Sequence, residues 1–112
     1  MEARAIARYI RMSPEKARRT LRLIQGLPLK EAQAMLMLMP HRSARAVRRV
    51  LDSAAANAEN NHGMDQGELW VKQASVDAGP TIKRWRFASA GRIGAIMKRI
   101  SHISVVLSDD ER

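Results

Sequence analysis

Hydrophobic and polar residues alternate with a period of two at three places along the chain. These places are Ala3–Ile10, Leu69–Ala78 and Ile100–Leu107. Successive side chains of a β-strand point to opposite faces of the sheet, so this period is typical of strands with one buried face. In the second segment the alternation puts Trp70 and Val76 on the same face.

Three stretches with helical character lie between the first two predicted strands. Ser13 is suited to cap a helix and Pro14 to occupy its first position, and Gly26 ends this helix. Leu29–Met39 is rich in unbranched helix formers and predicts a second, buried helix whose methionines and leucines fill the core. Arg42–Glu59 has apolar residues on one face and arginines on another, which predicts the longest amphipathic helix. A polar, asparagine-rich loop is expected after it.

The order strand, three helices, strand, strand predicts an α+β fold. In it, three helices pack on a small three-stranded antiparallel sheet. We expect a single domain over 1–112, with an extended hairpin at about 80–100 and a short tail at 109–112. If the hairpin arms pair outward from Pro80 and turn near Ala90-Gly91, each arm of about 10 residues projects by roughly 30 Å. A ribbon of two strands is marginally stable alone, so we expect its surroundings to order it.

The composition excludes several classes of function. The chain has no cysteine, which rules out disulfides, thiolate catalysis and cysteine-ligated metals. His41, His62 and His102 are too far apart for a metal motif, and the acidic residues are scattered, so we expect no metal, no cofactor and no enzyme activity. No apolar run approaches the length of about 18 residues that a membrane span needs, so no membrane partner is expected.

Charge indicates the partner. With 20 Lys and Arg against 11 Asp and Glu, the chain carries a formal charge of +9, which a polyanion would neutralise. Two zones carry the excess. The first consists of Arg4, Arg8, Arg11, Lys16, Arg18, Arg19 and Arg22. The second lies in the predicted hairpin, which contains no acid, and consists of Lys83, Arg84, Arg86, Arg92, Lys98 and Arg99. Both predict contacts with nucleic-acid phosphates.

Side chains within the basic zones suggest further contacts. Trp85 and Phe87 could stack on exposed bases, or simply pack on a neighbouring strand. His102, with Ser101 and Arg99 nearby, is expected to donate to a phosphate or to the backbone.

Several strings of the sequence resemble one family, and they occur in register over about residues 2–108. The strings are Ser13-Pro14 with Lys16 and Arg18, Ile24-Gln25-Gly26, the run from Ser53 to His62, Val76-Asp77-Ala-Gly79-Pro80, Lys83-Arg84, Gly91-Arg92, and Lys98-Arg99-Ile-Ser101-His102-Ile103. They resemble the bacterial-type ribosomal protein twenty-two of the large subunit.

The resemblance implies a structural component of the large ribosomal subunit. Such a protein binds large-subunit ribosomal RNA, supports assembly and lines the nascent-peptide exit tunnel with its hairpin tip. Its partners would be this RNA, neighbouring ribosomal proteins and the nascent peptide, with no DNA, and it would be a monomer within the ribosome. The expected location is the cytoplasmic ribosome, with an organellar ribosome as the open alternative.

The resemblance also implies site residues. Together with the charge analysis, it predicts RNA contacts at Arg4, Arg8, Arg11, Ser13, Lys16, Arg18, Arg22, Lys83, Arg84, Trp85, Arg86, Gly91, Arg92, Lys98, Arg99, Ser101 and His102. The tunnel-lining tip would be Ala88, Ser89, Ala90, Gly91 and Arg92.

The hairpin tip departs from the family pattern. The family commonly has Pro-Arg-Ala-basic before its Gly-Arg, whereas this chain has Phe87-Ala88-Ser89-Ala90. Ala95 stands where a basic residue is frequent, Glu15 stands where arginine is usual, and Arg86 restores one charge. We therefore expect a tip that is less cationic and smoother than in the relatives, so the family's tip-specific RNA contacts and antibiotic effects are not carried over to this chain.

Other nucleic-acid functions remain as alternatives. An architectural DNA-binding protein could wrap a duplex with basic ribbon arms and insert Phe87 or Ile93 between base steps, but such arms usually work in pairs. Gly91-Arg92-Ile93-Gly94 matches the GxxG loop of KH domains but is expected in a strand-rich segment rather than between helices. A nucleic-acid enzyme would need carboxylates near the ribbon, and none stands between Asp77 and Asp109.

Overall fold

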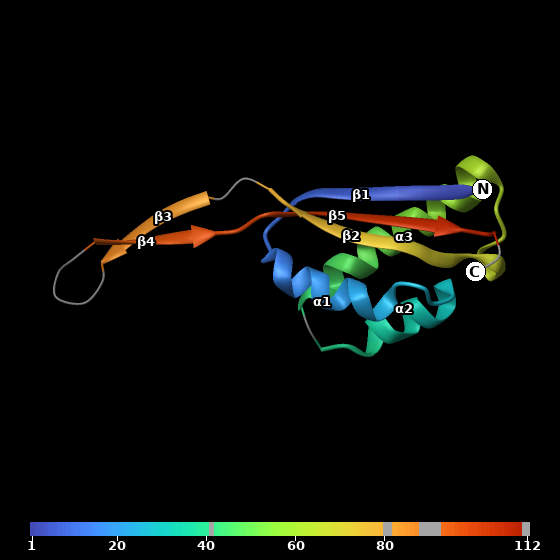
Figure 1. The fold of residues 1–112 in the computed structure, drawn as a ribbon, viewed down its shortest axis with the longest axis horizontal. Helices are drawn as coiled ribbons and strands as arrows, with labels where there is room; N and C mark the ends of the chain where they lie inside the picture. Colours follow the sequence, from blue (N-terminus) through green and yellow to red (C-terminus); the bar gives the residue numbers. More distant parts are fainter. Residues whose placement is uncertain (41, 80–81, 88–92, 111–112) are drawn as a thin grey trace.

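The structure is a computed structural model of the chain. It describes residues 1–40, 42–79, 82–87 and 93–110, and for 82–87 and 93–98 it describes the backbone alone. Three helices, one short 3₁₀ turn and five strands make up these residues (Figure 1).

The three predicted helices are present. They are α1 (Pro14–Ile24), α2 (Leu29–Leu38) and α3 (Arg42–His62). Helix α3 runs three residues beyond its predicted end, because its asparagines remain helical until Gly63 adopts a φ of 63°. At this glycine the backbone N–H groups of residues 63 and 64 donate to the carbonyls of Glu59 and Ala58, which satisfies the last turn of the helix.

The sheet has the predicted three antiparallel strands. Strands β1 (Glu2–Ile10) and β2 (Trp70–Ala78) flank β5 (Ser101–Ser108), which is therefore central. Helix α3 packs on β1 and β5, α1 packs on β2, and α2 packs on α3, so the helices gather on one side of the sheet (Figure 1). The core lies between these layers, where Ile103 and Leu107 of β5 are fully buried.

An irregularity in β2 changes which residues face the core. The pairing of β2 with β5 shifts register between Val71 and Gln73. A bulge of this kind lets residues of opposite parity point the same way. As a result Val71 and Val76 are both buried, while Trp70, which alternation places on the same face as Val76, is only half-buried. The short 3₁₀ turn η1 (Gln66–Glu68) precedes this strand.

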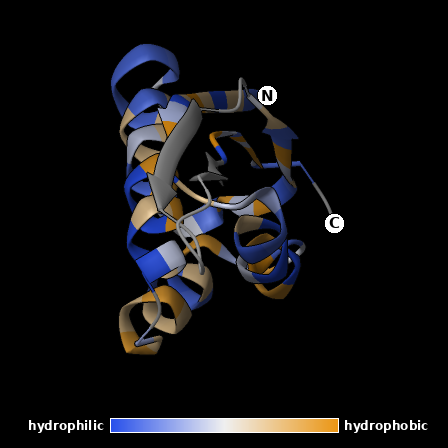
Figure 2. Cartoon of the chain, turned by 90° about the vertical axis from the view of Figure 1, so that its left-hand side faces the viewer, coloured by the Kyte–Doolittle hydropathy of each residue, from blue (hydrophilic) through white to orange (hydrophobic). Residues whose placement is uncertain are grey.

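Helix α2 is less buried than its composition predicts. Leu29, Ala32 and Leu36 enter the core, but Met37 is 66% exposed and Leu38 is 85% exposed. The prediction of a buried helix is therefore right for one face and wrong for the other, because α2 packs mainly on α3 and leaves its other face uncovered. Figure 2 shows hydrophobic colour on the α2 turns at the lower end of the molecule.

The predicted hairpin forms a second sheet of its own. Strands β3 (Ile82–Phe87) and β4 (Ile93–Lys98) pair antiparallel from Ile82 opposite Lys98 to Phe87 opposite Ile93. The hairpin projects from the body and gives the molecule extents of 60 × 25 × 19 Å (Figure 1). The turn predicted near Ala90-Gly91 lies outside the described residues.

Candidate nucleic-acid interface

The first basic zone is exposed on β1 and α1. On β1, Arg4 and Arg8 are exposed, on the face opposite the buried Ala3 and Ala5. On α1, the buried residues are spaced at helical intervals, namely Pro14, Ala17, Thr20, Leu21 and Ile24. The cations occupy the other positions and are all exposed, namely Lys16, Arg18, Arg19 and Arg22. Both elements therefore bury small or apolar residues and present charge to solvent.

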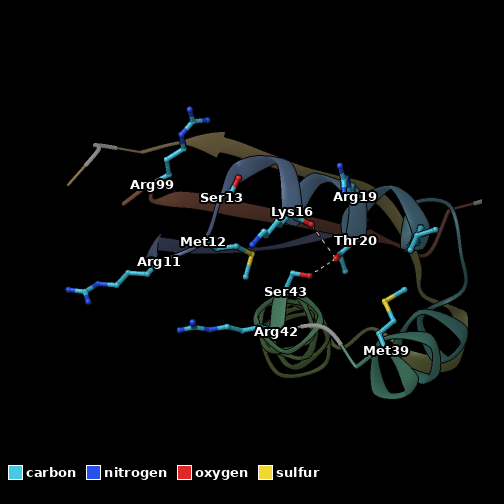
Figure 3. Close-up of a pocket in the computed structure, with 11 residues that line it drawn as sticks. Arg11, Met12, Ser13, Lys16, Arg19, Thr20, Met39, Arg42, Ser43 and Arg99 are labelled. Atoms are coloured by element: carbon cyan, nitrogen blue, oxygen red, sulfur yellow. Dashed lines mark hydrogen bonds between the residues drawn. The ribbon is translucent and has the colours of Figure 1, made fainter. Parts of the chain in front are cut away.

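A cavity of about 830 Å³ opens between the starts of α1 and α3, next to the point where the hairpin leaves the body. Its walls are Arg11, Met12, Ser13, Lys16, Arg19, Thr20, Leu23, Met39, Arg42, Ser43 and Arg99 (Figure 3). The hydroxyls of Thr20 and Ser43 lie 2.9 Å apart and join the two helices, and the Thr20 hydroxyl also donates to the carbonyl of Lys16. We call this space the neck cavity.

The electrostatics of the neck cavity are one-sided. Five of its lining side chains are cationic and none is acidic. Within the described part of the chain, none of these five cations forms an ion pair; the ion pairs there involve Met1, Arg48 and Lys72. Ser13 precedes α1 as predicted, but its side chain makes no capping hydrogen bond. The cavity is therefore a concentration of uncompensated positive charge, a setting that attracts anions.

The turn between β1 and α1 is fixed to β5 by a buried hydrogen bond. The Ser101 hydroxyl donates to the backbone carbonyl of Met12 over 2.6 Å, and Ser101 is fully buried. Ser101 is among the predicted RNA contacts, and in this structure its buried hydroxyl is bonded to the Met12 backbone. This hydrogen bond positions Met12 and Ser13, which line the neck cavity.

Tyr9 and His102 form an aromatic pair at the same end of the sheet. Tyr9 has a φ of 58°, the only positive value at a non-glycine residue in the described part of the chain. Its backbone N–H donates to His102 Nδ1 over 3.0 Å, and the two rings meet edge-on with centroids 5.0 Å apart. His102 thus accepts a hydrogen bond from the backbone, whereas the sequence predicts that it donates one, and the 65% exposed Tyr9 ring faces solvent.

Gly79 closes the body at the base of the hairpin. Its N–H donates to the carbonyl of Ile100 over 2.7 Å. A Cβ atom at Gly79 would lie 3.0 Å from His102 Nε2 and 3.1 Å from Ile100 Cγ2, so a larger residue fits there only if these side chains shift. The glycine therefore lets β2 and β5 approach closely before the hairpin begins.

The second basic zone is described in part. Backbone positions, without side chains, are described for Lys83, Arg84, Trp85, Arg86 and Lys98 in β3 and β4. The tip positions Ala88, Ser89, Ala90, Gly91 and Arg92 lie outside the described residues. Arg99 is exposed and lines the neck cavity, so it connects the hairpin with the first basic zone.

Sequence reasoning missed the neck cavity itself. It placed Arg42 on a helix face and Met39 in the core, and it gave Leu23, Thr20 and Ser43 no part in a site. The available signal was that two helices begin with serine and basic residues, near Ser13 and near Arg42. Nothing in their spacing says that the two helix starts face each other.

Acidic residues gather at the other end of the body. The Lys72 ammonium donates to the Glu2 carboxylate, and Trp70 Nε1 donates to the backbone carbonyl of Asp110. The hydrogen bond and the charge of Glu2 raise the pKa of Lys72. The part of this exposed pair's contribution that depends on the Lys72 charge is therefore present at neutral pH and is lost as pH rises through the raised pKa.

No helix in the described ranges has both the length and the apolar character to cross a membrane. Within the same ranges, no three His, Cys, Asp or Glu side chains are grouped as metal ligands would be.

The chain is similar to known proteins over nearly its whole length. The family model for ribosomal protein L22p/L17e matches residues 5–108. The large ribosomal subunit protein uL22 of Pelotomaculum thermopropionicum is 52% identical over 109 residues, which cover 97% of this chain and 96% of that protein. The corresponding protein of Halothermothrix orenii is 49% identical over the same shares. That of Thermoanaerobacter pseudethanolicus is 50% identical over 111 residues, with coverage of 99% and 100%.

Proposed function

The chain belongs to the ribosomal protein L22p/L17e family, and from this premise we propose that it binds large-subunit ribosomal RNA, supports subunit assembly and lines the nascent-peptide exit tunnel with its hairpin tip. Family membership makes the chain a structural component of the large ribosomal subunit in the cytoplasm and not an enzyme. The predicted recognition is therefore confirmed, and the molecular contacts are the proposal.

The observation that carries the proposal is the hairpin. Among the described residues, strands β3 and β4 pair with each other and with no strand of the body, and they extend a molecule whose long axis measures 60 Å. Two-stranded ribbons are at best marginally stable in water, so this one needs an environment that orders it. Its sequence between Asp77 and Asp109 has basic residues and no acid, so that environment is anionic.

The basic zones support RNA as the partner along two surfaces. The exposed cations of α1 include Lys16 and Arg19 of the neck cavity, and the sequence of the hairpin next to this cavity has no acid between Asp77 and Asp109. Arginine forks suit phosphates and can also stack on bases, both of which irregular RNA exposes. The RNA contacts proposed for Arg4, Arg8, Lys16, Arg18 and Arg22 rest on this arrangement.

A salt titration with large-subunit ribosomal RNA tests the binding proposal. If about 6–10 phosphates are neutralised, affinity falls by about 10³–10⁵ between 50 and 200 mM salt. A triple alanine variant at Lys83, Arg84 and Lys98 should reduce the slope of log affinity against log salt by about 3. The matched control removes three exposed cations of the body, Lys30, Arg48 and Lys72. A salt-independent affinity contradicts the proposal.

The tunnel proposal has its own test. A photo-crosslinking residue at position 90 should form adducts with a stalled nascent peptide in assembled ribosomes, whereas the same residue at the exposed Arg45 of α3 should not. Equal labelling from both positions, or labelling from Arg45 alone, would show that the tip does not line the tunnel.

A further inference from the structure

Cations are unevenly distributed in the neck cavity. Figure 3 shows Arg11, Arg42 and Arg99 at one end of the view and Met39 at the other, with Lys16 between them and Arg19 on the Met39 side of Lys16. Leu23, 54% exposed on α1, also lines the cavity. A site that binds only phosphates needs cations and polar groups. The thioether of Met39 and the aliphatic side chain of Leu23 add an apolar surface, on which the flat face of a ring can pack.

The size of the cavity restricts what can enter. A volume of about 830 Å³ lies within the range of about 300–1,000 Å³ that is typical of small-molecule sites. A nucleotide fits such a space, whereas an RNA duplex can only lie across its mouth. Proteins that recognise irregular RNA take up unpaired bases that are splayed out of the helix.

We propose that the neck cavity receives a single unpaired nucleotide of RNA, with its phosphates on the Arg11, Lys16 and Arg42 side and its base against Met39 and Leu23. This inference rests on the proposed RNA-binding function and deepens it, because it distinguishes an inserted nucleotide from phosphate contacts along a duplex. A free nucleotide has the same chemistry, so the experiment must separate the two sources.

Uncompensated charge favours occupation of the cavity by an anion. The five cations that line it have no ionic partner among the described residues, and each is exposed. Mutual repulsion of these side chains is relieved when phosphates bind between them. The bond between the Thr20 and Ser43 hydroxyls, one of them on each helix, keeps the two walls in place before a ligand arrives.

Methyl NMR of the full chain tests the inference directly, because methionines occur both inside and outside the cavity. The methyl groups of Met12 and Met39 lie in its walls, that of Met37 is 66% exposed on α2 outside it, and that of Met64 is buried in the core. A base inserted on the Met39 side shifts the Met39 signal by its ring current, with a smaller effect on Met12, and leaves Met37 and Met64 unchanged.

Three RNA hairpins serve as probes: one with a single bulged adenosine, one with an abasic bulge and one fully paired. We expect the Met39 shift with the bulged adenosine alone, and tighter binding of that RNA than of the other two. Adenosine monophosphate is the fourth probe. A Met39 shift with this mononucleotide and none with the bulged RNA would assign the cavity to free nucleotides and overturn the proposal.

Two variants on α3 provide the matched pair. Arg42→Ala removes a lining cation, and Arg45→Ala removes another exposed arginine, about one turn later, that does not line the cavity. Loss of one charge-assisted phosphate contact should weaken binding of the bulged RNA by about tenfold for Arg42→Ala, with little change for Arg45→Ala. Circular dichroism of both variants confirms that the fold is retained.

The outcomes separate this inference from the proposed function. If all three hairpins bind with the same affinity and strong salt dependence, and Met39 does not shift, RNA binding stands and nucleotide insertion is wrong. If neither these hairpins nor large-subunit ribosomal RNA binds, the proposed function itself fails.

Discussion

At the scale of single residues, Tyr9 shows most clearly how the neck is built. An L-residue with a positive φ costs roughly 1–2 kcal/mol, and at Tyr9 this cost is offset by the bond from its N–H to His102 and by contact between the rings. The register of β1 against β5 also shifts between Ala7 and Ile10. This distortion leaves the alternation of side chains intact up to Ala7 and redirects the chain toward the cavity residues Arg11 and Met12.

A pair of substitutions isolates the free-energy cost of the positive φ at Tyr9. Tyr9→Ala and Tyr9→Gly both remove the ring, and they differ only in the Cβ atom. In an ordinary strand, a protein with glycine at a position is less stable than one with alanine there by about 0.5–1 kcal/mol. At a positive φ we expect the order to reverse, so that the Tyr9→Gly variant is more stable than the Tyr9→Ala variant by about 1 kcal/mol. Urea denaturation measures the difference. Greater stability of Tyr9→Ala would show that Tyr9 is not strained.

At the scale of elements, the sequence predicts most of the fold and several of the cations of the site, but not the cavity that they line. Strand and helix positions follow from hydrophobic period and from end signals such as Ser13-Pro14 and Gly26. The bulge in β2 and the glycine cap of α3 are missed, because each depends on pairing or on one dihedral angle rather than on a period. The neck cavity is missed for a related reason: it joins Lys16 to Arg42 and Arg99, which only the packing of three elements brings together.

The close approach of β2 and β5 at Gly79 leads to a second stability test. Gly79→Ala places a Cβ against the His102 ring and Ile100, and overpacking of this kind costs about 1–3 kcal/mol. In a His102→Ala background the same change should cost less, because part of the obstruction is gone. A double-mutant cycle by chemical denaturation measures this coupling. Strict additivity would mean that the backbone, rather than the ring, accommodates the new methyl group.

At the scale of the whole molecule, charge is distributed unevenly along the long axis. Glu2 and Asp110 lie at the end that carries both termini, whereas the neck cavity and the basic hairpin lie toward the opposite end (Figure 1). Asp77 and Glu15 are the acids nearest the neck in sequence, and neither lines the cavity. We therefore expect an anionic polymer to approach the hairpin end of the protein first.

We expect local stability to differ along the same axis, low in the hairpin and high in the body. In the isolated protein we expect the backbone amides of β3 and β4 to exchange rapidly with deuterium, and those of Ile103, Val105 and Leu107 in the central strand to exchange slowly. Bound to large-subunit particles, the hairpin amides should become protected as well. Equal protection of hairpin and core in the free protein would contradict ordering by the partner.

The position of β5 has a mechanical consequence. Only Arg99 and Ile100 separate β4 from β5, so tension applied to the hairpin reaches the central strand directly. That strand is hydrogen-bonded to a neighbour on each side, and its bonds run perpendicular to the chain. Such a load must break many of these hydrogen bonds at once and cannot break them one after another. We therefore expect the body to resist being pulled apart through its hairpin.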